Sequence, residues 1–127
     1  MIGYADYEGD EDAMSGAFKS YLEKIGEALP KKGRLLDVGA ATGQFARLAE
    51  KKGWRASGIE ISQYAAEIGR KKGLKIFTDN FETYDAPENQ FDAVTFLDVL
   101  EHFANPETAL RQAQKTLKPG GILAINT

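Results

Sequence analysis

The stretch LLDVGAATG, residues 35–43, joins a short apolar run that contains Asp37 to a turn of glycine, alanine and threonine. An apolar run of this length is typical of a buried strand, and Phe45, Leu48 and Ala49 follow it with helical spacing. The two glycines allow a sharp turn and a close approach of the backbone to a ligand. The stretch therefore predicts a strand, a tight turn and a helix, in which the glycines serve either a ligand or the turn alone.

The triplet Lys-Lys-Gly recurs at residues 31–33, 51–53 and 71–73, each time between a helix-like and a strand-like segment. Lysine suits the negative end of a helix dipole, and the glycine after it can adopt the left-handed conformation that ends a helix. Apolar periodicity predicts four helices. The first covers residues 12–29 with Asp12 as N-cap, the second surrounds Phe45, and the fourth runs from Asn105 to Leu117. The third follows Ser62, and its Tyr64, Ala65 and Ile68 are expected to face inward. Strands are predicted at residues 34–38, 54–59, 74–77, 91–97 and 122–125.

Strands that alternate with helices of this length are joined by crossovers, which produce a parallel sheet. The sequence therefore predicts one α/β domain over residues 1–127, with a doubly wound, mostly parallel, Rossmann-like sheet of about five strands and helices on both faces. Such sheets bind ligands at the carboxyl ends of their strands. Residues 1–11 are expected to form a flexible segment before the first helix.

The composition supports a soluble protein. The chain has 127 residues, 43% of them hydrophobic, a net charge of −3 and no cysteine. The near balance of charges gives no support for a nucleic-acid partner, and no apolar run approaches the ~20 residues of a membrane-spanning helix. Without cysteines there is no disulfide framework, which fits a cytoplasmic protein. We expect no membrane partner, and no nucleic-acid partner is indicated.

Several kinds of ligand use a glycine-rich turn after the first strand. A phosphate-binding loop needs a lysine and a hydroxyl residue after its last glycine, where this chain has Gln44 and Phe45. The dinucleotide fingerprint needs three glycines, and two of those positions hold Ala41 and Gln44. Nucleoside triphosphates and dinucleotides therefore fit this turn poorly.

The spacing of Asp37, Gly39 and Gly43 resembles the first motif of class I S-adenosylmethionine-dependent methyltransferases. Two later stretches, FDAVTFLDVLEHF at 91–103 and LKPGG at 117–121, resemble the small-molecule methyltransferases of ubiquinone biosynthesis. The resemblance implies S-adenosylmethionine as cofactor, methyl transfer as activity and a small-molecule acceptor, which the sequence does not identify.

Within that resemblance, the expected cofactor-binding residues are Asp37, Gly39, Ala41, Gly43, Glu60, Ile61, Asn80, Phe81 and Leu97. The Asp37 carboxylate suits the cationic amino-acid end of the cofactor, and Glu60 can accept hydrogen bonds from both ribose hydroxyls. The family pattern places Gly39 against the methionine part and Ile61 against the adenine. Asn80 is expected to reach the adenine amino group, but a one-residue slip in the loop would give this role to Asp79.

His102 is the only histidine and follows the fourth predicted strand, on the side where the acceptor is expected. Imidazole takes up a proton near neutral pH, so His102 is the candidate general base; the alternative is a histidine that only packs its short helix. Asp98, Glu101 and His102 also match a divalent-metal pattern of some relatives, but their spacing alone does not make them converge, and no metal ligand is assigned.

The resembling enzymes have seven strands, whereas this sequence ends after the fifth. Either the sequence is a fragment of a longer enzyme, or the apolar strand 122–125 pairs with another copy and forms a homo-oligomer through its exposed edge. Two other classes of function remain. One is a cofactor-binding domain without turnover; the other is a nicotinamide-dependent oxidoreductase, which is disfavoured because Tyr21 and Lys24 lack the spacing of its catalytic pair.

Overall fold

The computed structural model describes residues 11–29 and 31–126. The segment 1–11, expected to be flexible, lies outside the described residues except for Glu11, which is helical. The described part contains a sheet of five parallel strands in the order β3-β2-β1-β4-β5. The strands are β1 (Arg34–Val38), β2 (Arg55–Glu60), β3 (Ile76–Thr78), β4 (Phe91–Leu97) and β5 (Leu117–Asn126).

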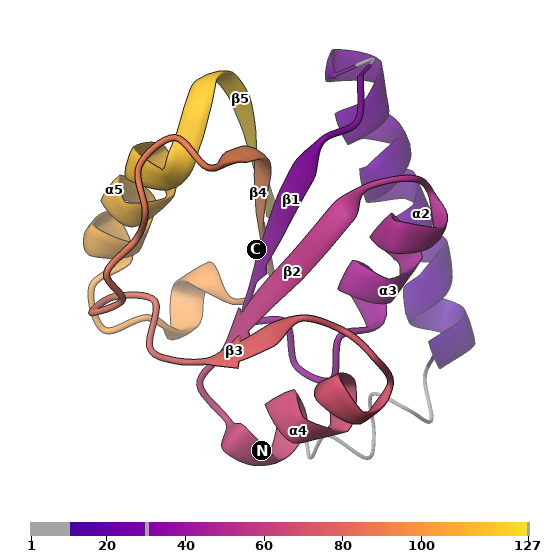
Figure 1. Cartoon of the computed structure of the whole chain (residues 1–127), viewed down its shortest axis with the longest axis horizontal. Helices are drawn as coiled ribbons and strands as arrows, with labels where there is room; N and C mark the ends of the chain where they lie inside the picture. Colours follow the sequence, from indigo (N-terminus) through magenta and orange to yellow (C-terminus); the bar gives the residue numbers. More distant parts are fainter. Residues whose placement is uncertain (1–10, 30, 127) are drawn as a thin grey trace.

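Helices cover both faces of this sheet (Figure 1). They are α2 (Glu11–Ala28), α3 (Gln44–Lys51), α4 (Gln63–Lys71), the short 3₁₀ helix η1 (Leu100–His102) and α5 (Pro106–Thr116). In Figure 1, α5 lies on one side of the strands, with α2 and α3 on the other. The predicted doubly wound α/β fold is therefore confirmed.

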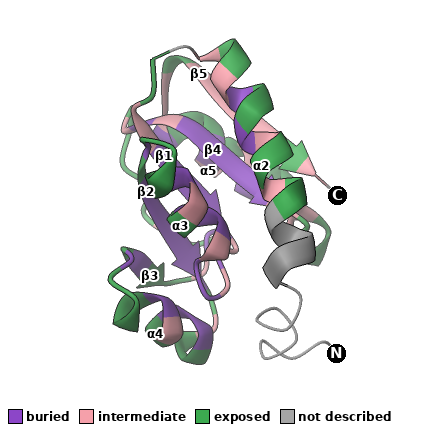
Figure 2. Ribbon diagram, turned by 90° about the vertical axis from the view of Figure 1, so that its right-hand side faces the viewer, coloured by how far each residue is buried: buried purple, intermediate pink, exposed green. Residues whose placement is uncertain are grey.

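The core has two halves because successive side chains of a strand point to opposite faces of the sheet. Leu35 of β1 packs with Ile25 of α2 and Phe45 of α3, whereas the next residue, Leu36, packs with Ala109 and Ala113 of α5. The central strands are buried along their length (Figure 2). This burial fixes the register of the strands and thereby the positions of their carboxyl ends.

Two predicted helix caps are confirmed. The Ser62 hydroxyl accepts a hydrogen bond from the Ala65 amide at 3.2 Å, and the Asn105 side chain accepts one from Thr108 at 3.2 Å. Asp12 is not an N-cap, because α2 already includes it. Each confirmed cap leads directly out of a loop at the carboxyl edge of the sheet, so both caps fix the direction in which the chain leaves that edge.

Three details of the prediction were wrong. Tyr64 is 68% exposed, because the buried face of α4 consists of the small residues Ala65, Ala66 and Gly69. Strand β3 begins at Ile76, so Leu74 precedes it. Strand β5 begins at Leu117, five residues earlier than predicted, and its register with β4 shifts between Phe91 and Ala93. Such an irregular start at a sheet edge accommodates a proline and two glycines, because an edge strand does not need every amide for pairing.

Candidate functional site

The turn after β1 needs both glycines of the motif. Gly39 and Gly43 have φ angles of 77° and 89°, in the left-handed region that other residues rarely adopt. A Cβ atom on Gly39 would lie 2.5 Å from Val99 Cγ2, and one on Gly43 would lie 2.5 Å from Leu74 Cδ1. The turn therefore brings its backbone against both the segment after β4 and the segment before β3.

Ala41 holds a left-handed conformation without being glycine, with a φ of 53°. Its amide donates a hydrogen bond of 2.8 Å to Glu60 Oε1. The amides of Gly39 and Ala40 both donate to the Ile59 carbonyl, at 2.8 and 3.1 Å. These bonds tie the turn to the end of β2 and hold Ala41 in a conformation that costs ~1–2 kcal/mol. Strain of this kind in a non-glycine residue is concentrated at binding sites.

Asp37 is a buried carboxyl group at the carboxyl end of β1. Its Oδ1 accepts a hydrogen bond of 2.7 Å from the hydroxyl of Thr95, which faces it in the neighbouring strand β4. Burial raises the pKa of Asp37 to about 7, the Thr95 hydrogen bond opposes this increase, and the negative charge of Glu60 adds to it. A cationic group placed beside Asp37 would stabilise its charged form.

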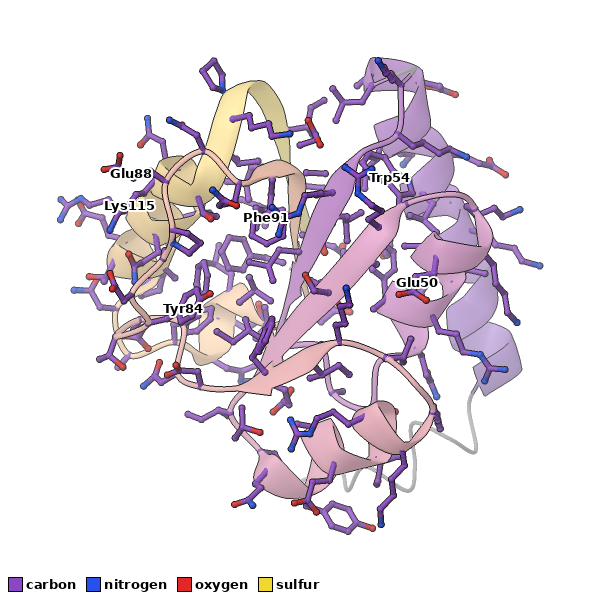
Figure 3. The ribbon with its side chains drawn as sticks, viewed as in Figure 1. Glu50, Trp54, Tyr84, Glu88, Phe91 and Lys115 are labelled. Atoms are coloured by element: carbon purple, nitrogen blue, oxygen red, sulfur yellow. The ribbon has the colours of Figure 1, made fainter. Side chains whose placement is uncertain are left out.

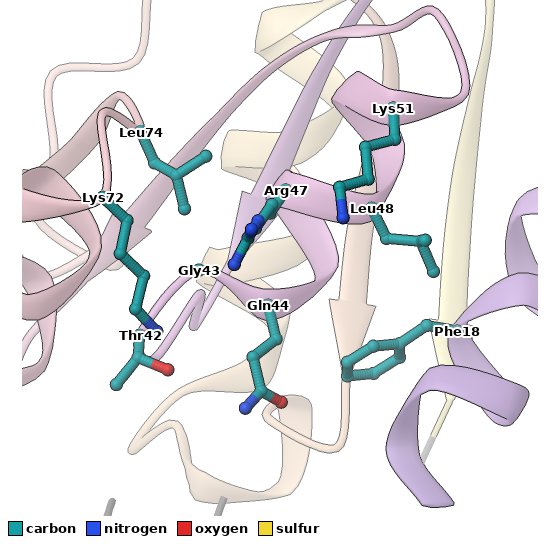
Figure 4. Close-up of a pocket in the computed structure, with 9 residues that line it drawn as sticks. All are labelled: Phe18, Thr42, Gly43, Gln44, Arg47, Leu48, Lys51, Lys72 and Leu74. Atoms are coloured by element: carbon teal, nitrogen blue, oxygen red, sulfur yellow. The ribbon is translucent and has the colours of Figure 1, made fainter. Parts of the chain in front are cut away.

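A small hollow of about 60 Å³ brings together four of the expected cofactor residues. Its lining includes Asp37, Gly39, Ala41 and Leu97, together with Phe18, Ala40, Thr42, Gln44, Phe45 and Asp98. Gly43 lines a second hollow, which shares Phe18, Thr42 and Gln44 with the first (Figure 4). The motif turn therefore contributes residues to two hollows at the start of α3.

The second hollow is positively charged. Arg47, Lys51 and Lys72 contribute side chains to its lining (Figure 4). The N-cap of α3 is Gly43, which has no side chain to cap the helix, and the first turn of this helix holds no acidic residue. The Thr42 hydroxyl is buried without a hydrogen-bond partner within the described residues. An anionic group would find a helix N-terminus, a hydroxyl donor and cationic side chains here.

Glu60 is buried at the end of β2. Its Oε1 accepts the hydrogen bond from Ala41 N, and its Oε2 accepts one from Ser62 N at 2.8 Å. The carboxylate is thus oriented by the turn after β1 and by the cap of α4. Next to it, Ile61 is 68% exposed and offers an apolar surface at the carboxyl edge.

In the loop after β3, the side chains of Asp79 and Asn80, the two candidates for the adenine contact, are hydrogen-bonded to backbone amides of the same loop. Asp79 Oδ1 accepts a hydrogen bond from Asn80 N at 2.7 Å, and Asn80 Oδ1 accepts one from Glu82 N at 2.9 Å. Phe81 is buried against Phe96 and Tyr84 and belongs to the core beneath the loop. A ligand could therefore meet Phe81 only through its backbone, whereas Asn80 lies in the partly exposed part of the loop.

His102 lies on η1 with its side chain 74% exposed, and its Nε2 is 3.6 Å from Glu101 Oε1. Asp98 Oδ1 instead accepts a hydrogen bond of 3.1 Å from Asn126 Nδ2. Within the described residues, no three histidine or acidic side chains are grouped closely enough to hold a metal ion, so the Asp98, Glu101 and His102 pattern does not converge there.

Sequence reasoning missed Thr95 and Thr42. Thr95 is a polar residue in the buried middle of β4, between Val94 and Phe96, and the parallel register of β1 and β4 sets it opposite Asp37. Pairing of the two predicted strands would have revealed this contact. Thr42 gave no signal, because threonine is ordinary in a turn and only the tertiary structure buries its hydroxyl.

Comparison with known proteins gives a family and its relatives. A family model for a methyltransferase domain matches residues 11–127. An uncharacterised protein of Methanocaldococcus jannaschii is 33% identical over 94% of this chain and 56% of its own length. A ubiquinone biosynthesis O-methyltransferase of Alkalilimnicola ehrlichii is 33% identical over 74% of this chain and 41% of its own length. The chain thus spans about half the length of these relatives.

A solved structure from Thermotoga maritima superposes with a TM-score of 0.76, at 29% identity, over 95% of this chain and 56% of that one. It is described as an S-adenosylmethionine-dependent methyltransferase and possible histamine N-methyltransferase. Within the described residues of this chain, no helix is long and apolar enough to cross a membrane.

Proposed function

Because the chain belongs to the class I S-adenosylmethionine-dependent methyltransferases, we propose that the carboxyl edge of its sheet binds this cofactor and that its methyl group goes to a small-molecule acceptor. The observation that carries the proposal is Asp37, a buried carboxyl group with a pKa of about 7 beside a glycine turn. A cationic ligand there would offset the unfavourable burial of its charge.

The two hollows beside Thr42 suit the two charged ends of the amino-acid part of the cofactor. Its ammonium group would lie in the hollow of Asp37, Gly39, Ala41 and Leu97. Its carboxylate would face the N-terminus of α3, where the buried Thr42 hydroxyl can donate a hydrogen bond and Arg47 supplies positive charge. A purely cationic ligand would match only the hollow that contains Asp37.

Adenosine would continue along the carboxyl edge towards β2 and β3. Glu60, held by the amides of Ala41 and Ser62, would accept from the ribose hydroxyls, and the exposed Ile61 would cover one face of the adenine. Asn80 would keep its bond to Glu82 N and accept a second hydrogen bond from the adenine amino group, because an amide oxygen has two lone pairs. Asp79 keeps the alternative role given by a one-residue shift.

When bound, the cofactor supplies an electrophilic methyl group; the residues of this chain bind, orient and exclude water. Methyl transfer depends mainly on in-line positioning of the acceptor, which can contribute several kcal/mol. His102, exposed beyond the end of β4, would take a proton from an acceptor that approaches from that side. The acceptor atom stays open, because one relative is named an O-methyltransferase and another a possible N-methyltransferase.

Self-association through β5 is part of the proposal. Among the described strands, β3 and β5 form the edges of the sheet. The β3 edge is only three residues long, and Arg70 Nη1 binds the carbonyl of Ile76 there at 2.7 Å. The β5 edge is longer, and Ile125 is 46% exposed. Unprotected apolar edges pair readily with other strands, and sedimentation of the chain would show such pairing.

A cofactor-binding domain without turnover is the second candidate, because the chain spans about half the length of its relatives. The acceptor pocket of those relatives would then include the half that this chain does not cover, so binding and turnover are tested separately. We place the protein in the cytoplasm, which supplies the cofactor.

Calorimetric titration with S-adenosylhomocysteine tests the binding site. We expect saturable binding that Glu60→Ala and Asp37→Asn each weaken at least about tenfold, the loss expected when a charge-assisted bond is removed. Glu50→Ala is the matched control, because Glu50 is an exposed acid of the same helix α3 and lines neither hollow (Figure 3). Binding of NAD with similar affinity, or no binding by folded wild type, would contradict the proposal.

A further inference from the structure

Glu82 connects two loops that lie at the ends of different strands. Its Oε1 accepts a hydrogen bond from Ala104 N at 3.0 Å, and its Oε2 accepts one from Asn105 N at 3.0 Å. Glu82 belongs to the loop after β3, whereas Ala104 and Asn105 belong to the loop between η1 and α5. A carboxylate that accepts two amides forms stronger, charge-assisted bonds than a neutral acceptor would.

On the cofactor side, Glu82 is bound to the residue expected to meet adenine. Asn80 Oδ1 accepts the hydrogen bond from Glu82 N at 2.9 Å, which closes a turn within the loop. The position of the Glu82 backbone therefore depends on the orientation of the Asn80 side chain. The Glu82 carboxylate links this backbone, through its two hydrogen bonds, to Ala104 and Asn105.

On the acceptor side, the two bonded amides belong to Ala104 and Asn105, which directly follow His102 and Phe103. The side chain of Asn105 also caps α5 by accepting a hydrogen bond from Thr108 N. The segment that carries His102 is thus held at its carboxyl end by Glu82 and by the start of α5. Removing the Glu82 carboxylate would leave this end attached only by its cap and by packing.

An aromatic row lies beneath the same two loops. Phe81 is next to Glu82 and contacts Phe96 of β4 with ring centroids 5.9 Å apart. Phe96 contacts Phe103 at 6.1 Å. The same two segments are therefore joined twice, by aromatic packing in the core and by the Glu82 hydrogen bonds nearer the surface.

We propose that Glu82 is a positioning residue that couples cofactor binding at the loop after β3 to the placement of the His102 segment on the acceptor side. The inference rests on the proposed function. A bound adenine restricts the turn between Asn80 and Glu82, and the carboxylate passes this restriction to Ala104 and Asn105. The chain thereby orders its acceptor side when the cofactor is present.

Amide hydrogen exchange measured by NMR, with and without S-adenosylhomocysteine, tests the coupling. The variants are Glu82→Ala, which removes both acceptors, and Glu82→Gln, which keeps one oxygen. Glu88→Ala is the matched control, because Glu88 is an exposed acid in the same connection and lies away from the carboxyl edge (Figure 3). Calorimetry on each variant measures binding of the same ligand independently.

In wild type and Glu88→Ala, we expect the ligand to slow exchange at Ala104 and Asn105 about tenfold, a size typical of coupled sites. In Glu82→Ala, exchange there becomes independent of ligand, while the amides of residues 39–41 stay protected by it. In Glu82→Gln, an intermediate effect is expected. A merely structural role would change exchange equally with and without ligand.

Full ligand-dependent protection in Glu82→Ala would overturn the inference, as would wild type that binds the ligand without any change at Ala104 and Asn105. If Glu82→Ala does not fold, Glu82→Gln decides: reduced coupling supports the inference and unchanged coupling overturns it. If wild type shows no binding in calorimetry, the proposed function and the inference are both overturned. This outcome is recognisable because the ligand would then not protect the amides of residues 39–41 either.

Discussion

The turn after β1 and the segment after β4 lie against each other at the carboxyl edge, yet they are built in opposite ways. The turn is buried and fixed by backbone hydrogen bonds, and its glycines leave no space for a side chain. The segment from Asp98 to Asn105 exposes its polar side chains, among them Glu101 and His102. In the proposed site, backbone geometry would therefore set the cofactor half, and side chains that can be replaced without disturbing the fold would set the acceptor half.

The largest effect is expected from Gly39→Ala, which forces these two regions apart. The left-handed φ of 77° costs ~1–2 kcal/mol for alanine, and overpacking against Val99 adds ~1–3 kcal/mol. Urea unfolding should show the summed loss, and binding of S-adenosylhomocysteine should be lost.

Gly73→Ala is the matched control for this prediction. Gly73 has a similar φ of 88°, and a Cβ there meets nothing within 4 Å. Its variant should therefore show only the loss due to strain. Equal losses in both variants would mean that the contact between the turn and Val99 is unimportant. Adding Val99→Ala to Gly39→Ala should partly restore stability if the contact matters.

The next effect concerns the pH dependence of stability, which arises from Asp37. Its pKa is raised in the folded state, so its contribution to the free energy of unfolding is fully present below the unfolded value of 3.8 and is lost as the pH rises through about 7. Asp37→Asn lacks this titration. Its free energy of unfolding relative to wild type should therefore increase between about pH 4 and pH 8, by on the order of a few kcal/mol.

Thr95→Val provides the comparison for Asp37. Removing the hydroxyl that stabilises the charged carboxylate should raise the pKa of Asp37 further, and move the loss of stability to higher pH. Parallel unfolding curves of Asp37→Asn and wild type across this pH range would refute the assignment. Ligand affinity should follow the opposite trend, increasing with pH as Asp37 becomes charged.

The smallest effect on the folded protein is expected from His102→Gln in the exposed segment. Because the His102 side chain is 74% exposed, the free energy of unfolding should change by less than about 0.5 kcal/mol. Affinity for S-adenosylhomocysteine should be unchanged. Turnover, measured as product release with a panel of small phenols and amines, should fall about 10²-fold or more if His102 removes a proton. A large loss of stability or of ligand affinity would contradict the contrast between the two regions.

The sequence anticipated the parts of the molecule that depend on neighbouring residues. The buried run before Gly39, the caps at Ser62 and Asn105, and the alternation of strands and helices are local signals, and the structure contains them all. Tyr64 and the start of β5 were predicted wrongly because local periodicity does not reveal which face of a helix meets the sheet, or how an edge strand accommodates Pro119.

Contacts between residues far apart in the sequence could not be anticipated in the same way. The bond from Thr95 to Asp37 follows from strand register, and the bonds from Ala104 and Asn105 to Glu82 follow from the meeting of two loops. Thr95 becomes informative only once β1 and β4 are paired, and Glu82 has no distinctive local pattern.

By itself, the sequence determined the α/β architecture, the glycine turn and the acidic residues at the ends of β1 and β2, because apolar periodicity and glycine placement act over a few residues. Only the tertiary structure decided the raised pKa of Asp37, the buried Thr42 hydroxyl and the link through Glu82. Burial and hydrogen-bond partners depend on which segments meet in space, and that is settled when the helices pack on both faces of the sheet.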